Sequence, residues 1–300
     1  MRLIKPSFQI IEQSPGIEGV YKQIELVGRT CYKSEDKITE DSAKGFVERM
    51  IKSGHGAVLE HGTVYLKYEE ELVRGIQECD IIFRKYKYNK YSAYTNSRIT
   101  KSDRTIIGGY VTTNLRVLIE NNWLDDLQYL CEPTEYHEKR CTVKFICDRG
   151  ILAEFTRHRK FSFMAESTRY CNYSKNKFNN ELTFIIPCWV DDIEEKSYTS
   201  FVEYHPTKYD PVKLWFDVCM NSEDTYIDLL DKGWKPEQAR NVLPLSLKTE
   251  LVMTGFIHDW KHFFSLRALG TTGAPHPQAK ELAEPLMREF EKRGLLCTTQ

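Results

Sequence analysis

The sequence predicts an α+β fold, and three observations carry this prediction. Three short stretches rich in β-branched and aromatic residues have the pattern of strands. Longer stretches elsewhere repeat apolar residues at helical spacing. Strands and helices do not alternate in the βαβ order that a doubly wound sheet requires. For a chain of 300 residues, this favours one large domain over several small ones.

The first half of the chain contains a helical pattern and the first two predicted strands. "EDSAKGFVERMIKSG" repeats apolar residues every three to four positions, which predicts a helix that ends at Gly54. "TVYLKY" (63–68) and "TVKFIC" (142–147) predict strands, and "LTFIIP" (182–187) predicts a third strand that ends at a proline. Between the first two strands, the tyrosine-rich stretch and the helical pattern "TTNLRVLIENNW" are interpreted as an insertion at about 70–135 in a single domain covering 1–300.

The last third of the chain is expected to be helical. "PEQARNVLP" predicts a short helix that begins at Pro236, because proline is favoured in the first turn. "LKTELVMTGFIHDWKHFFSLRAL" (247–269) predicts one long helix with apolar faces. "GTTGAPHP" interrupts it, and a final helix is expected to start near Pro277.

Composition restricts the possible partners and the compartment. Lys+Arg 42 against Asp+Glu 43 leaves a formal net charge of -1, which argues against a general polyanion binder. The start, "MRLIKPSFQI", lacks the apolar core of a signal peptide, and no apolar run approaches the length of a bilayer span. The 9 cysteines are odd in number and include no C-x-x-C pair, so we expect reduced thiols, a cytoplasmic location and no membrane association.

Two local motifs resemble ligand sites but lack essential parts. "GHGAVLEHG" has no third glycine at the dinucleotide spacing and follows a predicted helix, so it fails as a Rossmann turn. "HDWKH" places His258 and His262 on one helical face, as in zinc proteases. However, Asp259 is one methylene shorter than the glutamate those enzymes use, and no third ligand follows. We therefore predict no metal site.

Two further stretches support alternative functions. "IPCWV" contains Cys188, which would be a nucleophile if a base or a cation lowered its pKa, although its neighbours are apolar. "KYKYNKY" (85–91) alternates lysine and tyrosine, as a surface that stacks single-stranded nucleic acid would. A buried thiol and a solvated, tyrosine-rich surface are the simpler interpretations.

The strongest signal is the positive charge in "FTRHRKFSFMAESTRY". Its basic residues are Arg157, His158, Arg159, Lys160 and Arg169, and its single acid is Glu166. Guanidinium groups bind phosphates in a two-pronged geometry, and Ser167 and Thr168 add hydroxyls beside Arg169. In a nearly neutral chain, this window predicts a local site for an anion such as a mononucleotide phosphate.

Three blocks of the chain resemble the flavin-dependent thymidylate synthase family. "RHRKFSFMAESTRY" is similar to the family signature: Arg-His-Arg, two residues, Ser, four residues, Ser, one residue, Arg. "GHGAVLEHGTVYL" resembles the segment that ends in Glu-His before a strand, and "ARNVLPLSLKTELVMTGFIHDWKHFFSLRAL" resembles the C-terminal block. The blocks keep the family's order over about 54–278. The chain departs from the family at Met164-Ala165, Phe256 and His258, where polar residues or a different cation are usual.

The resemblance implies a fold, a reaction and an assembly. It implies a twisted, mostly antiparallel sheet flanked by helices, in a homotetramer whose active sites lie between subunits. The reaction is the reductive methylation of dUMP to dTMP, with methylenetetrahydrofolate as the carbon donor and NADPH as the reductant of bound FAD. The positive window then faces two anionic ligands, and no nucleic acid is a partner.

The resemblance also assigns roles to individual residues. It gives Arg267 a catalytic role, because a preorganised guanidinium near the pyrimidine carbonyl stabilises developing negative charge. The residues implied to bind dUMP are Glu154, Arg157, Ser167, Thr168, Arg169, Arg240 and Arg267. The residues implied to contact FAD are His55, Ala57, Glu60, Arg157, His158, Arg159, Ala165, His258 and His262. The alternatives are a thymidylate synthase with Cys188 as nucleophile, and a nucleic-acid-binding module that uses 85–91 and the arginine window.

Overall fold

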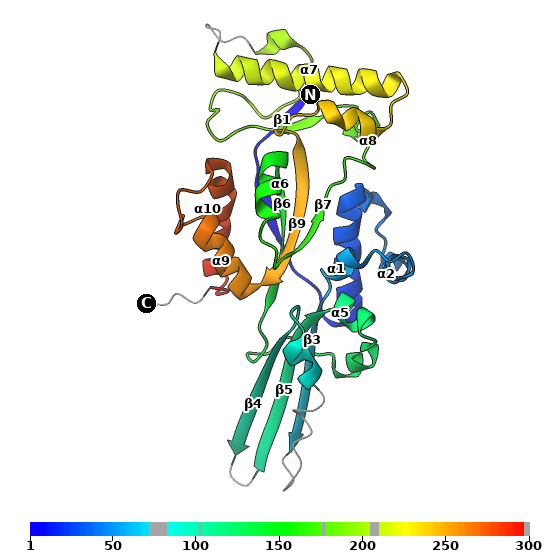
Figure 1. Ribbon diagram of the computed structural model, residues 1–300, viewed down its shortest axis with the longest axis vertical. Helices are drawn as coiled ribbons and strands as arrows, with labels where there is room; N and C mark the ends of the chain where they lie inside the picture. The colour runs from blue at the N-terminus through cyan, green and yellow to red at the C-terminus, as the bar shows by residue number, and fades with distance from the viewer. Residues whose placement is uncertain (72–82, 102–103, 176–177, 205–209, 297–300) are drawn as a thin grey trace.

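A four-stranded antiparallel sheet forms the centre of the molecule and confirms the α+β class. The computed structural model describes residues 1–71, 83–101, 104–175, 178–204 and 210–296. Helices lie on both sides of the central sheet, and a second sheet projects away from it (Figure 1). In sheet order, the central strands are β2 Ser7–Ile11, β6 Arg140–Asp148, β9 Lys248–Phe256 and β7 Ser162–Ala165.

Strand β9 corrects one sequence prediction, because 247–269 is not a single helix. The segment forms β9 and then helix α9, Ile257–Arg267. β9 pairs with β6 on one side and with β7 on the other, and all of its residues between the two ends are buried. A strand covered on both faces has a continuous apolar pattern that periodicity does not distinguish from a buried helix.

Helices pack against each face of the central sheet (Figure 1). On one side, α9 contributes Trp260, Phe263 and Phe264 to a core that includes Phe145 of β6. On the other side, α1 contacts β7 and β9. The predicted helix that ends near Gly54 is confirmed as α2, and Gly54 has the positive φ of +71° that glycine adopts easily. The flanking helices are α1 Gly16–Tyr32, α2 Ser42–Lys52, α3 Gly56–Leu59, α9 and α10 Pro277–Lys292.

The projecting sheet contains β3 and two strands of the predicted insertion. Its strands, in sheet order, are β3 Thr63–Glu71, β5 Arg104–Asn114 and β4 Ala93–Lys101, all antiparallel. The predicted helix at 112–123 is shorter than expected, because β5 continues to Asn114 and α5 spans Leu115–Glu120. Residues 72–82 and 102–103 of the insertion lie outside the described residues. The division into one domain with an insertion stays a prediction.

The remaining elements include a parallel strand pair and the long helix α7 at the end of the molecule opposite the projecting sheet (Figure 1). They enclose a second core, to which Phe184, Phe216 and Tyr226 contribute. The predicted strand at 182–187 is confirmed as β8, and the predicted short helix at Pro236 as α8. None of the described helices combines the length and apolar character that crossing a membrane requires. The bounds are β1 Arg2–Ile4, β8 Thr183–Ile185, α6 Arg149–Phe155, α7 Pro211–Asp231 and α8 Pro236–Ala239.

Candidate active site

The guanidinium of Arg267, at the end of α9, is held by residues at the end of α6. Its Nη1 donates to Glu154 Oε2 at 2.6 Å, and its Nη2 donates to the Glu154 carbonyl at 3.0 Å. Its Nε donates to His158 Nε2 at 3.1 Å. Three hydrogen bonds fix the plane of the guanidinium, so Arg267 does more than neutralise the C-terminal end of α9.

His158 is neutral at physiological pH. Burial, together with the nearby charges of Arg267 and His262, lowers the pKa of His158 from 6.5 to about 4. Because Nε2 accepts a hydrogen bond from Arg267, the proton of the neutral ring is on Nδ1. The ring packs against Phe263, with centroids 5.0 Å apart. His158 therefore orients the guanidinium without adding a second positive charge beside it.

The turn at Ser167–Arg169 lies against the end of α1 and against Arg240. The Ser167 amide donates to the Cys31 carbonyl at 3.0 Å. Thr168 is buried, and its Oγ1 accepts a hydrogen bond from Arg240 Nη1 at 3.2 Å. Arg169 is exposed, and its Nε lies 3.9 Å from Glu237. Two guanidinium groups and two hydroxyls thus gather around one turn, a donor set that suits a phosphate.

The residues predicted to bind dUMP form two groups, one around Arg267 and one around the Ser167 turn. The two groups lie at opposite ends of α6. Arg149, the first residue of α6, donates to the carbonyl of Glu166, the residue before the Ser167 turn, at 3.4 Å. Glu154 and His158 lie at the other end of the helix. Seven helical residues span roughly 10 Å, so α6 separates the two groups within one chain.

All the predicted flavin residues except His258 form two sets. His158 and His262 lie together near Arg267, with ring centroids 6.1 Å apart, and Arg157 and Arg159 are exposed beside them. Among the described residues, no salt bridge involves Arg157 or Arg159. The second set lies around α3, which packs against β7.

The second set begins with His55 and Ala57, which are exposed at the start of α3. Glu60 follows α3, and its carboxylate accepts a hydrogen bond from Arg116 at 2.5 Å. Ala165 ends β7 and pairs with Leu251. Apart from both sets, His258 contacts the carboxylate of Glu138 and stacks on Phe256.

The sequence did not predict a buried ionic network beneath the Ser167 turn. Glu166 Oε2 accepts a hydrogen bond from Lys248 Nζ at 2.8 Å, and Glu166 Oε1 accepts one from Tyr173 at 2.9 Å. Lys248 also donates to Glu250 at 2.8 Å, and Lys33 donates to the same carboxylate at 2.7 Å.

Burial alone would raise the pKa of Glu250, but the ammonium groups of Lys248 and Lys33 outweigh it and lower that pKa to about 2. Lys248 and Glu250 are two residues apart on β9 and therefore lie on one face of the strand. Interpreting this segment as a strand would have revealed the pair in the sequence.

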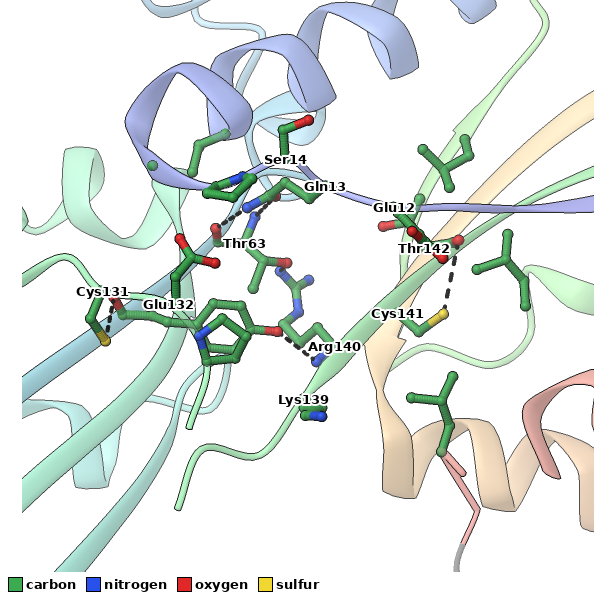
Figure 2. A pocket seen from close by; sticks show the side chains of 18 of the residues that line it. Glu12, Gln13, Ser14, Thr63, Cys131, Glu132, Lys139, Arg140, Cys141 and Thr142 are labelled. Carbon is green, nitrogen blue, oxygen red and sulfur yellow. Dashed lines mark hydrogen bonds between the residues drawn. The ribbon is translucent and has the colours of Figure 1, made fainter. Parts of the chain in front are cut away.

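A cavity of about 610 Å³ lies where β2, the start of α1, β3 and β6 meet (Figure 2). Its lining includes Gln13, Thr63 and Arg140, and Arg140 Nη1 donates to Thr63 Oγ1 at 3.2 Å. The described residues that line it include none of the predicted dUMP or FAD residues. Arg140 was not predicted because its partners are far away in the sequence.

The structure disfavours part of each alternative function, although Tyr88 and Tyr91 of the 85–91 stretch are exposed. Burial and the charge of Glu281 raise the pKa of Cys188, which disfavours the thiolate. In the 85–91 stretch, Tyr86 is fully buried, and its hydroxyl donates to Asp126 at 2.5 Å. Lys85 forms an ion pair with the same carboxylate at 2.6 Å. A stacking surface would need these side chains at the surface.

Comparison with known proteins identifies the family. The family model for thymidylate synthase complementing protein matches residues 133–293, more than half of the chain. The flavin-dependent thymidylate synthase of Synechocystis sp. is 29% identical over 168 residues, which cover 50% of this chain and 66% of that protein. A probable flavin-dependent thymidylate synthase of Paramecium bursaria Chlorella virus 1 is 29% identical over 163 residues, covering 50% and 67%. The enzyme of Thermococcus kodakarensis is 30% identical over 152 residues, covering 50% and 53%.

The matched part of the chain thus spans between about half and two thirds of the length of these relatives. Among solved structures, the UMP/dUMP methylase PolB from Streptomyces cacaoi, bound with 5-Br dUMP, aligns over 97% of this chain and 93% of that chain. Its TM-score is 0.43 and its sequence identity is 17%, so the assignment rests on the sequence matches. The resemblance to flavin-dependent thymidylate synthases is confirmed, and the chain belongs to the thymidylate synthase complementing protein family.

Proposed function

We propose that this protein is a flavin-dependent thymidylate synthase that methylates dUMP to dTMP. Methylenetetrahydrofolate is the carbon donor and NADPH is the reductant. The observation that carries the proposal is the orientation of Arg267 by Glu154 and His158, inside the part of the chain that the family model matches. The curated relatives are named flavin-dependent thymidylate synthases, which supports a flavin in this chain.

In the proposed site, Ser167, Thr168, Arg169 and Arg240 bind the dUMP phosphate. Glu154, Arg157 and Arg267 lie against the uracil ring. Uracil C5 is a weak nucleophile, and it becomes a better one when the ring is polarised so that negative charge builds up on a ring carbonyl oxygen before C5 attacks the folate-derived carbon. Arg267 donates hydrogen bonds to that oxygen. Because Glu154 and His158 already orient the guanidinium, it does not have to reorient during the reaction.

The donor set of the chain fits FAD. The pyrophosphate requires cations, and Arg157 and Arg159 are exposed guanidinium groups beside His158 and His262. We assign these residues, together with His55, Ala57, Glu60, Ala165 and His258, to the flavin site. When bound, the flavin supplies the hydride that completes the methyl group. The residues of this chain hold the flavin next to dUMP and exclude water from the reacting carbon.

The proposed active protein is a cytoplasmic homotetramer with sites between subunits. Within one chain, α6 separates the Arg267 group from the Ser167 turn. A site formed by two chains brings the Arg267 group of one chain to the Ser167 turn of another. Oligomers with closed symmetry repeat such a contact at every equivalent interface.

The proposal is tested with the purified protein, FAD, dUMP, methylenetetrahydrofolate and NADPH. We expect a flavin absorbance band and dTMP formation that stops when FAD or NADPH is left out. Cys188→Ser is expected to retain most of this activity, because no thiolate adds to the pyrimidine. The absence of FAD binding, or complete loss of activity in folded Cys188→Ser, would contradict the proposal.

A further inference from the structure

Arg140, the first residue of β6, connects several segments that are distant in the sequence. Its Nη1 donates to the Glu60 carbonyl at 3.0 Å and to Thr63 Oγ1 at 3.2 Å. Its Nη2 lies 3.4 Å from Ser162 Oγ, at the start of β7. Its guanidinium carbon is 5.7 Å from the centre of the Phe256 ring, at the end of β9.

The contacted segments carry several of the residues proposed to bind flavin. Glu60 is itself one of them and follows His55 and Ala57. Ser162 begins the strand that ends at Ala165, and Phe256 precedes the helix that contains His258. None of these segments adjoins Arg140 in the chain, so their relative positions depend on its side chain as well as on strand pairing.

Arg140 makes these contacts as a cation whose hydrogen bonds go to a carbonyl and to hydroxyls. Among the residues that the structure describes, none of the salt bridges involves Arg140. Burial lowers the pKa of Arg140 to about 10, so the side chain stays charged at neutral pH. Burying part of a cation is costly unless its N–H groups are hydrogen-bonded, and here the Glu60 carbonyl and the hydroxyls of Thr63 and Ser162 accept those hydrogen bonds. The planar fork of five N–H donors reaches oxygens on separate segments, which the single ammonium of lysine does not.

The contact between Arg140 and Thr63 also supports a role for Arg140 in positioning the neighbouring segments. Thr63 lies beside Arg140 at the cavity between β2, β3 and β6 (Figure 2). Gln13, from the loop before α1, exchanges two hydrogen bonds with the Thr63 backbone, each of 2.8 Å. Gln13 and Arg140 therefore both hold the start of β3. Because Arg140 also binds the Glu60 carbonyl, it fixes Glu60 relative to this strand.

We propose that Arg140 is a positioning residue for flavin binding, which fixes the Glu60 segment relative to β7 and to the end of β9. This inference rests on the proposed function, because it assumes that these segments meet at the flavin. It assigns Arg140 no contact with dUMP and no part in the chemical step. Loss of its fork geometry weakens FAD binding and leaves dUMP binding intact.

The test compares Arg140→Lys and Arg140→Met with wild type. FAD affinity is measured by flavin fluorescence titration, dUMP affinity by calorimetry, and folding by circular dichroism and thermal melting. We expect the FAD Kd to rise about tenfold or more, the scale of lost hydrogen bonds from a charged group. The dUMP Kd should stay within about twofold of the wild-type value, because Arg140 is assigned no contact with dUMP. The matched control is Lys139→Met, an exposed cation that lines the same cavity and should leave both constants unchanged.

Ser162→Ala and Thr63→Val keep the guanidinium and remove one acceptor each, so they decide the question if neither Arg140 variant folds. Each should raise the FAD Kd by about two- to tenfold, the scale of one typical hydrogen bond, because the other acceptors of Arg140 remain in place. A purely structural role would lower the melting temperature and weaken dUMP and FAD together. Unchanged FAD affinity in folded Arg140→Lys, or in both acceptor variants, overturns the inference. A wild-type protein that binds no FAD instead contradicts the proposed function itself.

Discussion

The two ends of α6 hold their positive charges in different ways. At one end, Arg267 makes three hydrogen bonds to Glu154 and His158 within the chain. At the other, Arg240 donates a hydrogen bond to Thr168, and Arg169 lies at the surface 3.9 Å from Glu237. Such a surface pair contributes little, so Arg169 retains its capacity to bind an anion. Under the proposed function, the first end orients the Arg267 guanidinium and the second binds the dUMP phosphate.

The ionic network of Lys248, Glu166 and Glu250 lies beneath the Ser167 turn. A substitution in this network is expected to have the largest effect on stability. Lys248→Met removes the cation between Glu166 and Glu250, and losing one partner of a buried ion pair typically costs about 3–5 kcal/mol. We expect the free energy of unfolding to fall by this amount in denaturant titrations at pH 7. The matched control, Lys232→Met, removes an exposed cation on the C-cap of α7 and should change stability by less than about 0.5 kcal/mol.

The same network predicts a pH dependence. In the folded protein, the pKa of Glu250 is about 2, below its usual value of 4.5. Its contribution to stability is therefore complete above about pH 4.5 and is lost as the pH falls toward 2. Removing Lys248 raises this pKa, so Lys248→Met should unfold at a higher pH than wild type in an acid titration followed by circular dichroism. Identical acid midpoints would show that the pairing contributes nothing.

Arg267→Lys tests the oriented end directly. Lysine keeps the positive charge at the end of α9 but loses the planar contact with Glu154 and His158. We expect a folded, flavin-bound protein whose dTMP formation falls about a hundredfold or more, the scale of one lost transition-state donor. Turnover close to wild type would reduce Arg267 to a residue that stabilises the helix end.

Arg169→Ala tests the exposed end. Losing a charge-assisted contact with phosphate should weaken dUMP binding about ten- to a hundredfold, with FAD still bound. Calorimetry with dUMP and fluorescence titration with FAD measure the two effects on the same sample. If dUMP affinity is unchanged, the phosphate binds elsewhere and the comparison between the two ends fails.

The sequence predicted what depends on short stretches of chain and missed what depends on strand pairing. The Arg157–Arg169 window was found because its charges are contiguous, and α2 because its apolar spacing is regular. The Lys248–Glu250 pair was missed because a strand buried on both faces was interpreted as part of a helix.

The role of Arg140 was not predicted from the sequence because it depends on long-range contacts. Arg140 has no unusual neighbours in the sequence, and its contacts with Glu60 and Ser162 exist only once β6, β7 and the α3 segment are assembled. Glu154 and Arg267 are also far apart in the sequence and meet only in the folded chain. Only the resemblance to a family placed both residues in one site.

We propose that two chains each contribute one end of α6 to a shared site that makes dTMP. The most direct measurement is dTMP formation by oligomers that contain both Arg267→Lys and Arg169→Ala chains, co-expressed with different affinity tags and purified through both. At a dUMP concentration well below the Kd of the Arg169→Ala variant, each variant alone should be nearly inactive. In mixed oligomers, some sites combine an intact Arg267 from one chain with an intact Arg169 from another, and random assembly restores toward about a quarter of wild-type activity. Activity no higher than that of the separate variants would contradict a site shared between two chains.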